Sequence, residues 1–84
     1  ELIIKQDEKN YILDAKIGIY DIEEELDLEF PEDRDYDTLG GYIFFQLEKI
    51  PEKGESVKFE NWTFKVMDLS ENRIKTVQAK KINE

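Results

Sequence analysis

Residues 35–55 read DYDTLGGYIFFQLEKIPEKGE and contain the only long apolar segment of this chain. Thr38 is a residue type that caps helix N-termini, and turn-forming residues at 51–54 close the segment. Between them runs an apolar stripe at helical spacing, formed by Leu39, Ile43, Leu47 and Ile50. Three aromatic residues widen this stripe almost to the whole circumference. The segment therefore predicts the one substantial helix, buried on more than one side and lying across a sheet.

Two features of this segment leave alternatives open. Aromatic and β-branched residues dominate 42–47, so periodicity alone does not exclude a strand there. Gly40 and Gly41 fall in the first helical turn, where each glycine costs roughly 1 kcal/mol relative to alanine. Such glycines permit a close approach to another backbone or to a ligand. Their apolar neighbours favour close packing.

Both ends of the chain predict antiparallel strands. The β-type runs are residues 2–4, 11–13, 56–60, 62–66 and 74–79. Asn61 lies at the reversal between two of them and is a residue type that tolerates left-handed geometry. In the run 62–66, Trp62, Phe64 and Val66 alternate with polar residues, which predicts a half-buried strand. This alternation slips at 67–69, which indicates a β-bulge.

A short acidic helix is predicted between the first strands and the 35–55 segment. Asp21 is the expected N-cap, with Glu24 three positions later as in a capping box. Ile22 and Leu26 share one face of this helix. The helix is expected to end near Leu28, ahead of a Phe-Pro pair that disfavours helical angles.

The resulting order predicts an α+β domain. A mixed or antiparallel sheet from the N- and C-terminal strands should pack on the short acidic helix and the longer helix. Residues 1–84 are enough for one domain. The chain starts at Glu1 in a strand-like sequence without a methionine, so we expect a domain cut from a longer protein. No apolar run approaches the roughly 18–20 residues that span a bilayer, so direct membrane insertion is not expected.

The composition excludes several classes of function. The chain has no cysteine and no histidine, which removes thiolate metal sites, His-based triads and nearly every zinc site. Its net charge is -9, and residues 21–37 hold ten acidic residues against one basic residue, Arg34. A nucleic-acid partner or an anionic membrane contact is therefore disfavoured. The acidic segment is either a solvated surface or a face for cations or a basic partner. The C-terminal end of the chain is mildly basic, with Arg73, Lys75, Lys80 and Lys81.

Alternating aspartates offer one candidate metal site. Asp33, Asp35 and Asp37 resemble the start of an EF-hand loop, and their oxygen atoms suit magnesium or calcium. The central glycine and the closing acid of such a loop are missing, so no metal is the main expectation and divalent-cation sensing is an alternative. Acidic pairs could be imagined as glycosidase groups, but so many acids in one stretch indicate surface. We expect no enzyme activity.

The motif DYDTLGG at 35–41, followed by IPEKGE at 50–55, resembles the CorC/HlyC transporter-associated domain. This family occurs at the C-terminus of bacterial proteins named as hemolysin-related or as magnesium and cobalt efflux proteins. The likeness extends over residues 2–82 and includes an acidic helix that ends in LDLEFP at 26–31. Two positions depart from the family pattern, because Glu48 and Asn61 stand where glycine is common.

The resemblance implies a fold likened to the FAD-binding domains of flavoenzymes. It also implies attachment behind a pair of CBS domains, often with a transmembrane region before them. The implied role is an accessory, regulatory domain at the cytoplasmic face of the bacterial membrane that modulates ion transport. The family supplies no catalytic residues to carry over.

Two further possibilities remain open at this point. A flavin or adenine nucleotide module is an alternative that rests on fold analogy, with Gly40, Gly41 and Gly54 as the positions where a ligand could approach. No Rossmann fingerprint or Walker lysine motif supports it. An exposed sheet edge could also mediate a homodimer.

Overall fold

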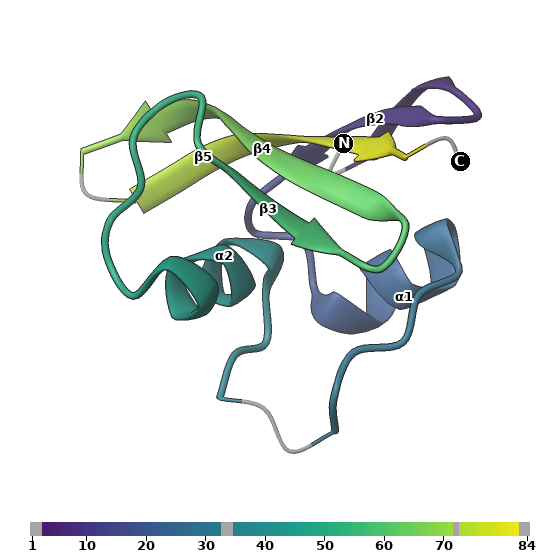
Figure 1. The fold of residues 1–84 in the computed structure, drawn as a ribbon, viewed down its shortest axis with the longest axis horizontal. Coiled ribbons are helices and arrows are strands. Elements are labelled where there is room, and N and C mark those ends of the chain that lie inside the picture. Colours follow the sequence, from purple (N-terminus) through teal and green to yellow (C-terminus); the bar gives the residue numbers. More distant parts are fainter. Residues whose placement is uncertain (1–2, 33–34, 72, 83–84) are drawn as a thin grey trace.

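A five-stranded sheet carries two helices on one face in the computed structural model, which describes residues 3–32, 35–71 and 73–82 (Figure 1). The elements in chain order are β1 (Ile3–Asp7), β2 (Asn10–Asp14), α1 (Ile19–Leu26), α2 (Leu39–Leu47), β3 (Ser56–Phe59), β4 (Trp62–Ser70) and β5 (Arg73–Lys81). The strand order is β1-β2-β5-β4-β3, and every neighbouring pair is antiparallel. The predicted α+β class, with a sheet from both chain ends, is confirmed.

The centre of the sheet joins the two ends of the chain. β2 pairs with β5 from Asn10 opposite Lys80 to Asp14 opposite Thr76, so the first and last parts of the domain lie side by side. β1 and β3 form the two edges. The pairing of β4 with β5 shifts register around Asp68, which confirms the bulge predicted at 67–69.

Helix α1 begins earlier than the sequence predicts. Gly18 is the N-cap, with extended angles of φ -72 and ψ 151, and no side chain caps the helix. The prediction of Asp21 as the cap is wrong, because Asp21 lies within the first turn. Burial of Ile19 outweighs the capping preference, since that side chain is only 1% exposed.

The other end and the buried face of α1 follow from its pattern. The helix ends at Leu26 rather than near Leu28, because Asp27 adopts a left-handed φ of 57 and its N–H donates to the Glu23 carbonyl. The buried residues are Ile19, Ile22 and Leu26. Their spacing of three and four confirms the predicted apolar face.

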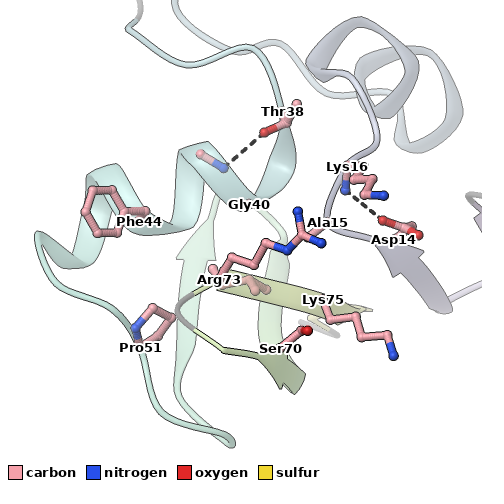
Figure 2. Close-up of a pocket in the computed structure, with 12 residues that line it drawn as sticks. Asp14, Ala15, Lys16, Thr38, Gly40, Phe44, Pro51, Ser70, Arg73 and Lys75 are labelled. Carbon is pink, nitrogen blue, oxygen red and sulfur yellow. Dashed lines mark hydrogen bonds between the residues drawn. The ribbon is translucent and has the colours of Figure 1, made fainter.

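Helix α2 begins at the predicted cap. The Thr38 hydroxyl oxygen accepts a hydrogen bond from the Gly41 N–H at 3.2 Å (Figure 2). The helix stops at Leu47, because Glu48 takes a left-handed φ of 55 and its N–H donates to the Phe44 carbonyl at 2.8 Å. With nine residues, α2 is therefore barely longer than α1, which has eight.

The predicted burial of α2 on more than one side is wrong. Leu39, Tyr42 and Ile43 are buried, whereas Phe44 and Phe45 are 51% and 50% exposed. Among the described residues, helices cover one face of the sheet only, and no further layer lies on the outer side of α2 (Figure 1). Ile50 lies beyond the helix and is 48% exposed.

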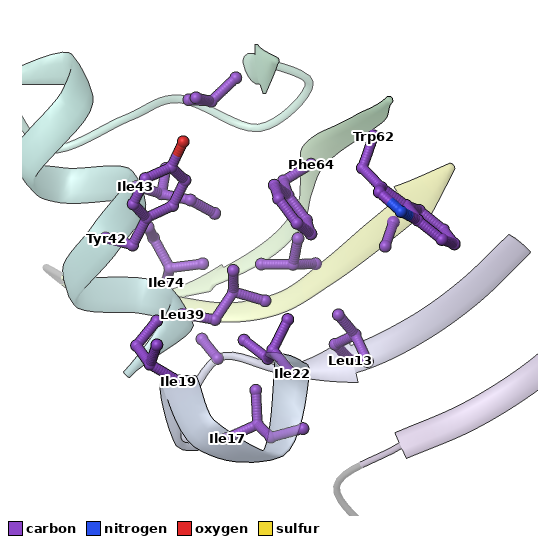
Figure 3. Packing of buried hydrophobic residues seen from close by; sticks show 14 of the residues in the cluster. Leu13, Ile17, Ile19, Ile22, Leu39, Tyr42, Ile43, Trp62, Phe64 and Ile74 are labelled. Atoms are coloured by element: carbon purple, nitrogen blue, oxygen red, sulfur yellow. The ribbon is translucent and has the colours of Figure 1, made fainter. Parts of the chain in front are cut away.

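The core fills the space between the helices and the inner face of the sheet (Figure 3). Trp62, Phe64 and Val66 alternate along β4 and are all buried, as the sequence predicts. Aromatic rings extend this core beneath α2, where Phe30 stacks on Phe59 with ring centroids 4.4 Å apart and meets Tyr42 edge-on at 5.1 Å.

The β3–β4 reversal differs from the prediction in one detail. Glu60 adopts the left-handed conformation with φ 53, while Asn61 does not. Asn61 instead accepts at its carbonyl the N–H of Ile82. Asn61, the residue type that tolerates the left-handed conformation, therefore follows directly after Glu60, the residue that adopts it.

Candidate functional site

A hollow of about 440 Å³ lies where the start of α2 meets the segment after β2 and the β4–β5 end of the sheet (Figure 2). We call it the basic hollow. Of the described residues, Lys16, Arg73 and Lys75 are its cationic side chains, and Asp14 is its one carboxylate. This concentration of positive charge contrasts with the chain's net charge of -9.

Backbone pairing builds the floor of the basic hollow. The Gly40 N–H donates to the Ala15 carbonyl at 3.0 Å, and the Leu39 N–H donates to the Ile17 carbonyl at the same distance. A Cβ atom on Gly40 would lie 3.2 Å from the Ala15 Cβ and 3.3 Å from its carbonyl oxygen. This contact confirms the close packing predicted for Gly40.

The first N–H groups of α2 all have partners within the domain. Besides the bonds of Leu39 and Gly40, Gly41 donates to the Thr38 hydroxyl and Tyr42 donates to the Thr38 carbonyl. An anion at this helix terminus would therefore find no unused backbone donor. Any anion in the basic hollow has to be held by side chains.

The three cations that line the basic hollow remain available for a ligand. Within residues 3–32, 35–71 and 73–82, Lys16, Arg73 and Lys75 make no ion pair shorter than 4.0 Å. Arg73 extends across the hollow toward Lys16, whereas Lys75 points away from Arg73 (Figure 2). The Asp14 carboxylate already accepts the Lys16 backbone N–H at 2.8 Å.

An apolar wall completes the basic hollow. It consists of Phe44, Pro51 and Ile74, of which Phe44 is half exposed. Apolar walls with a few placed polar groups are typical of small-molecule sites. Two hydroxyls line the hollow as well: that of Thr38 is engaged as a cap, and that of Ser70 has no histidine beside it, since the chain contains none.

A second hollow, of about 840 Å³, is acidic. Its carboxylates are Glu23, Glu29, Glu32 and Glu60. Tyr20, Phe30 and Phe59 provide aromatic surface, and Glu23 accepts the Phe30 N–H at 2.7 Å. Part of the acidic excess of residues 21–37 thus gathers beside the β3–β4 turn, away from the residues of the basic hollow.

The structure separates the three glycines that were predicted as ligand-approach positions. Gly40 and Gly41 both line the basic hollow, and Gly54 does not. Gly54 has φ +97 and its N–H donates to the Val66 carbonyl at 2.8 Å, so a turn requires it. Ligand approach at Gly40 and Gly41 stays a prediction.

The predicted aspartate site is only partly visible. Asp33 lies outside the described residues. The Asp37 carbonyl accepts the Ile19 N–H at 2.9 Å, and Asp35 lines a third hollow, of about 600 Å³, beside Phe45. In the described part of the chain, no three carboxylates gather as metal ligands.

Sequence reasoning missed the basic hollow as a unit. Lys16 comes from the first part of the chain, and Arg73 and Lys75 come from the last strand. The pairing of β2 with β5 brings them together. The mildly basic composition of residues 73–81 was the one available signal.

The titratable groups with clearly shifted pKa values lie elsewhere. Burial raises the pKa of Tyr42 to about 12. The Glu52 N–H and Lys49 lower the pKa of Glu55, and the Lys9 N–H and Asn10 lower that of Asp7. None of these three groups lines the basic or the acidic hollow.

Neither α1 nor α2 is long and apolar enough to cross a bilayer, and the described residues contain no further helix.

Comparison with known proteins gives a consistent result. The family model of the transporter associated domain, CorC_HlyC, matches residues 4–83. The polyamine export protein of Escherichia coli K12 is 37% identical over 84 residues, which are 99% of this chain and 19% of that protein. The chain therefore spans about a fifth of the length of the polyamine export proteins it matches.

Solved structures share the fold. A CorC_HlyC domain from Haemophilus ducreyi superimposes with a TM-score of 0.82 at 26% identity, over 96% of this chain and 98% of that one. The associated region of a putative Mg2+ and Co2+ transporter from Neisseria meningitidis MC58 gives a TM-score of 0.89 at 24% identity, over 98% and 100% of the two chains. The match over nearly the whole length shows that this chain belongs to the CorC_HlyC transporter associated domain family.

Proposed function

We propose that this chain is a non-catalytic accessory domain of a membrane transport protein and modulates transport of a cationic substrate. The family match over residues 4–83 carries this proposal. The relatives that contain the domain are several times longer than it is, which leaves room for a separate transport machinery. The domain would act at the cytoplasmic face of the membrane.

The names of two relatives indicate which class of substrate the parent protein transports. One relative is a polyamine export protein, and the N. meningitidis domain is described as part of a putative Mg2+ and Co2+ transporter. Polyamines and divalent metal ions are both cations. We therefore propose a cation as the substrate of the parent protein. The domain would influence transport of this cation without itself lying within the bilayer.

The proposed contacts are with CBS domains and the transmembrane region of the parent protein. The outer side of α2, with the segment that follows it, is the surface best suited to such a contact, because Phe44 and Phe45 on the helix and Ile50 after it are each about half exposed. Phe45 also packs against the Tyr36 ring, with centroids 5.4 Å apart. Light scattering of the chain in solution tests whether a second copy of the domain occupies this surface instead.

Transport by the parent protein tests the proposal. Cells that express the full-length protein, or the same protein without this domain, are loaded with radiolabelled putrescine, magnesium or cobalt, and efflux is followed. We expect the truncated protein to reach the membrane fraction and to export its cation at a changed rate. Unchanged efflux of all three cargoes at equal membrane abundance would contradict a modulatory role.

A point variant separates contact from folding. Phe45→Ala removes half-exposed apolar surface from α2, and Ile4→Ala removes a similarly exposed side chain, 53% exposed, from edge strand β1. We expect only Phe45→Ala to change efflux. Equal effects of the two variants would show that the outer side of α2 is not the contact.

A further inference from the structure

We propose that the basic hollow binds a nucleoside phosphate, with the base against Phe44 and Ile74 and the phosphate on Arg73. This inference does not depend on the transport role. It rests on the chemistry of the hollow, which joins a cationic end to an apolar wall within about 440 Å³. That volume lies within the range of about 300–1,000 Å³ typical of small-molecule sites.

The cationic end selects an anion. Arg73 presents a planar set of N–H donors that match two oxygen atoms of a phosphate at once. It has no ion-pair partner in the part of the chain that the structure describes. Lys16 and Lys75 add positive charge, and the single carboxylate, Asp14, already accepts a backbone N–H. A polyamine or a metal ion would be repelled from this hollow.

The apolar wall selects the body of the ligand. Phe44 is 51% exposed, so one part of its ring is open to a ligand, and aromatic rings stack with nucleobases. Ile74 is buried and Pro51 closes the same side. A bare phosphate would use the cations and leave this wall uncovered, so a ligand with a flat apolar part fits better.

The glycine floor explains why the hollow stays open. Gly40 and Gly41 place no side chain in it. Their N–H groups are bonded to Ala15 and Thr38, so the floor contributes shape rather than charge. The ligand is thus recognised by side chains from three separate segments, which are Arg73, Lys16 and Phe44.

Amide chemical shifts of the isotope-labelled 84-residue chain test the site. AMP, FMN, adenosine and inorganic phosphate are added separately up to millimolar concentration. We expect AMP to give saturable shifts at Ala15, Gly40, Gly41 and Ile74. Adenosine, which has no phosphate, and phosphate, which has no base, should each bind more weakly than AMP. FMN tests whether a flavin replaces the purine.

Matched variants locate the charge that matters. Arg73→Gln is expected to weaken AMP binding about tenfold or more, because hydrogen bonds to charged groups are among the strong ones. Lys58→Gln removes the same charge from β3, at a position outside the hollow, and should leave the affinity unchanged. Phe44→Ala should weaken binding of AMP and leave binding of phosphate unchanged.

Three results would overturn the assignment. One is the absence of shifts in the basic hollow with every nucleotide at millimolar concentration. Another is an equal loss of affinity in Arg73→Gln and Lys58→Gln, which would indicate non-specific attraction. The third is equal affinity for AMP and phosphate. If Arg73→Gln does not fold, Arg73→Lys replaces it in the binding measurement. Weaker AMP binding than in the unmodified chain is again the expected result.

Discussion

Replacing Glu48 with glycine is expected to stabilise the domain. Glu48 ends α2 with φ 55 and ψ 30, and its N–H donates to the Phe44 carbonyl. The left-handed conformation costs an L-residue roughly 1–2 kcal/mol. Glycine avoids that cost but loses about 0.5–1 kcal/mol more backbone entropy on folding. The free energy of unfolding should therefore rise by about 0.5–1 kcal/mol.

The Glu48 side chain offers little that the substitution would remove. It is exposed, and among the described residues it forms no hydrogen bond or ion pair. A carboxylate at a helix C-terminus is also mildly unfavourable to the helix dipole. Glu48→Ala removes the same charge and keeps a Cβ atom, so it isolates the backbone effect.

Thermal and urea unfolding, followed by circular dichroism, measure the difference. For a domain of this size the expected gain corresponds to a Tm increase of about 2–8 °C, and Glu48→Gly should exceed Glu48→Ala. If the two variants are equally stable, or if Glu48→Gly unfolds more readily, the left-handed backbone at position 48 is not a source of strain.

Three other changes probe different contacts. Gly40→Ala should lower the free energy of unfolding by about 1 kcal/mol, because overpacking against Ala15 costs roughly 1–3 kcal/mol and the helix gains about 1 kcal/mol. Thr38→Ala should lower it by about 1 kcal/mol through loss of the cap. Burial raises the pKa of Tyr42 from 10.0 to about 12, so neutral Tyr42 contributes stability that is complete below pH 10. That stability, on the order of 2 kcal/mol, should be lost as the pH rises toward 12.

Urea unfolding measures all three, and each has its own control. A more stable Gly40→Ala would mean that Ala15 moves aside at no cost. Thr38→Ser keeps the hydroxyl and should retain most of the stability; a loss equal to that of Thr38→Ala would rule out the cap. Tyr42→Phe cannot ionise, so its stability should fall less between pH 10 and 12 than that of the unmodified chain. If the free energy of unfolding falls equally with pH in both proteins, Tyr42 is not the titrating group.

Local patterns predicted those parts of the fold that depend on neighbours in the sequence. The strand alternation of Trp62, Phe64 and Val66 held because one face of β4 is buried. The bulge at 67–69 and the Thr38 cap also follow from residues within a few positions of each other. Such features need no knowledge of the rest of the chain.

Features that depend on distant segments were predicted less well. α1 starts two positions before Asp21, because Ile19 is buried and Gly18 forms a bridge with Thr38. The apolar residues of α2 did not reveal that one side has no layer to cover it. The basic hollow depends on β2 lying beside β5, and no local pattern contains that pairing.

Backbone hydrogen bonds that join the starts of α1 and α2 determine where the chain can be lengthened at low cost in stability. The Ile19 N–H donates to the Asp37 carbonyl, and the Leu39 N–H donates to the Ile17 carbonyl, so these bonds close a loop that contains α1 and the acidic stretch between the helices. Doubling the length of a flexible loop whose ends are held together adds only about 0.6 kcal/mol to the entropic cost of closing it. Insertions between the buried residues Phe30 and Tyr36 are therefore expected to cost little closure entropy, and this part of the stretch is a natural place for a foreign peptide to be displayed.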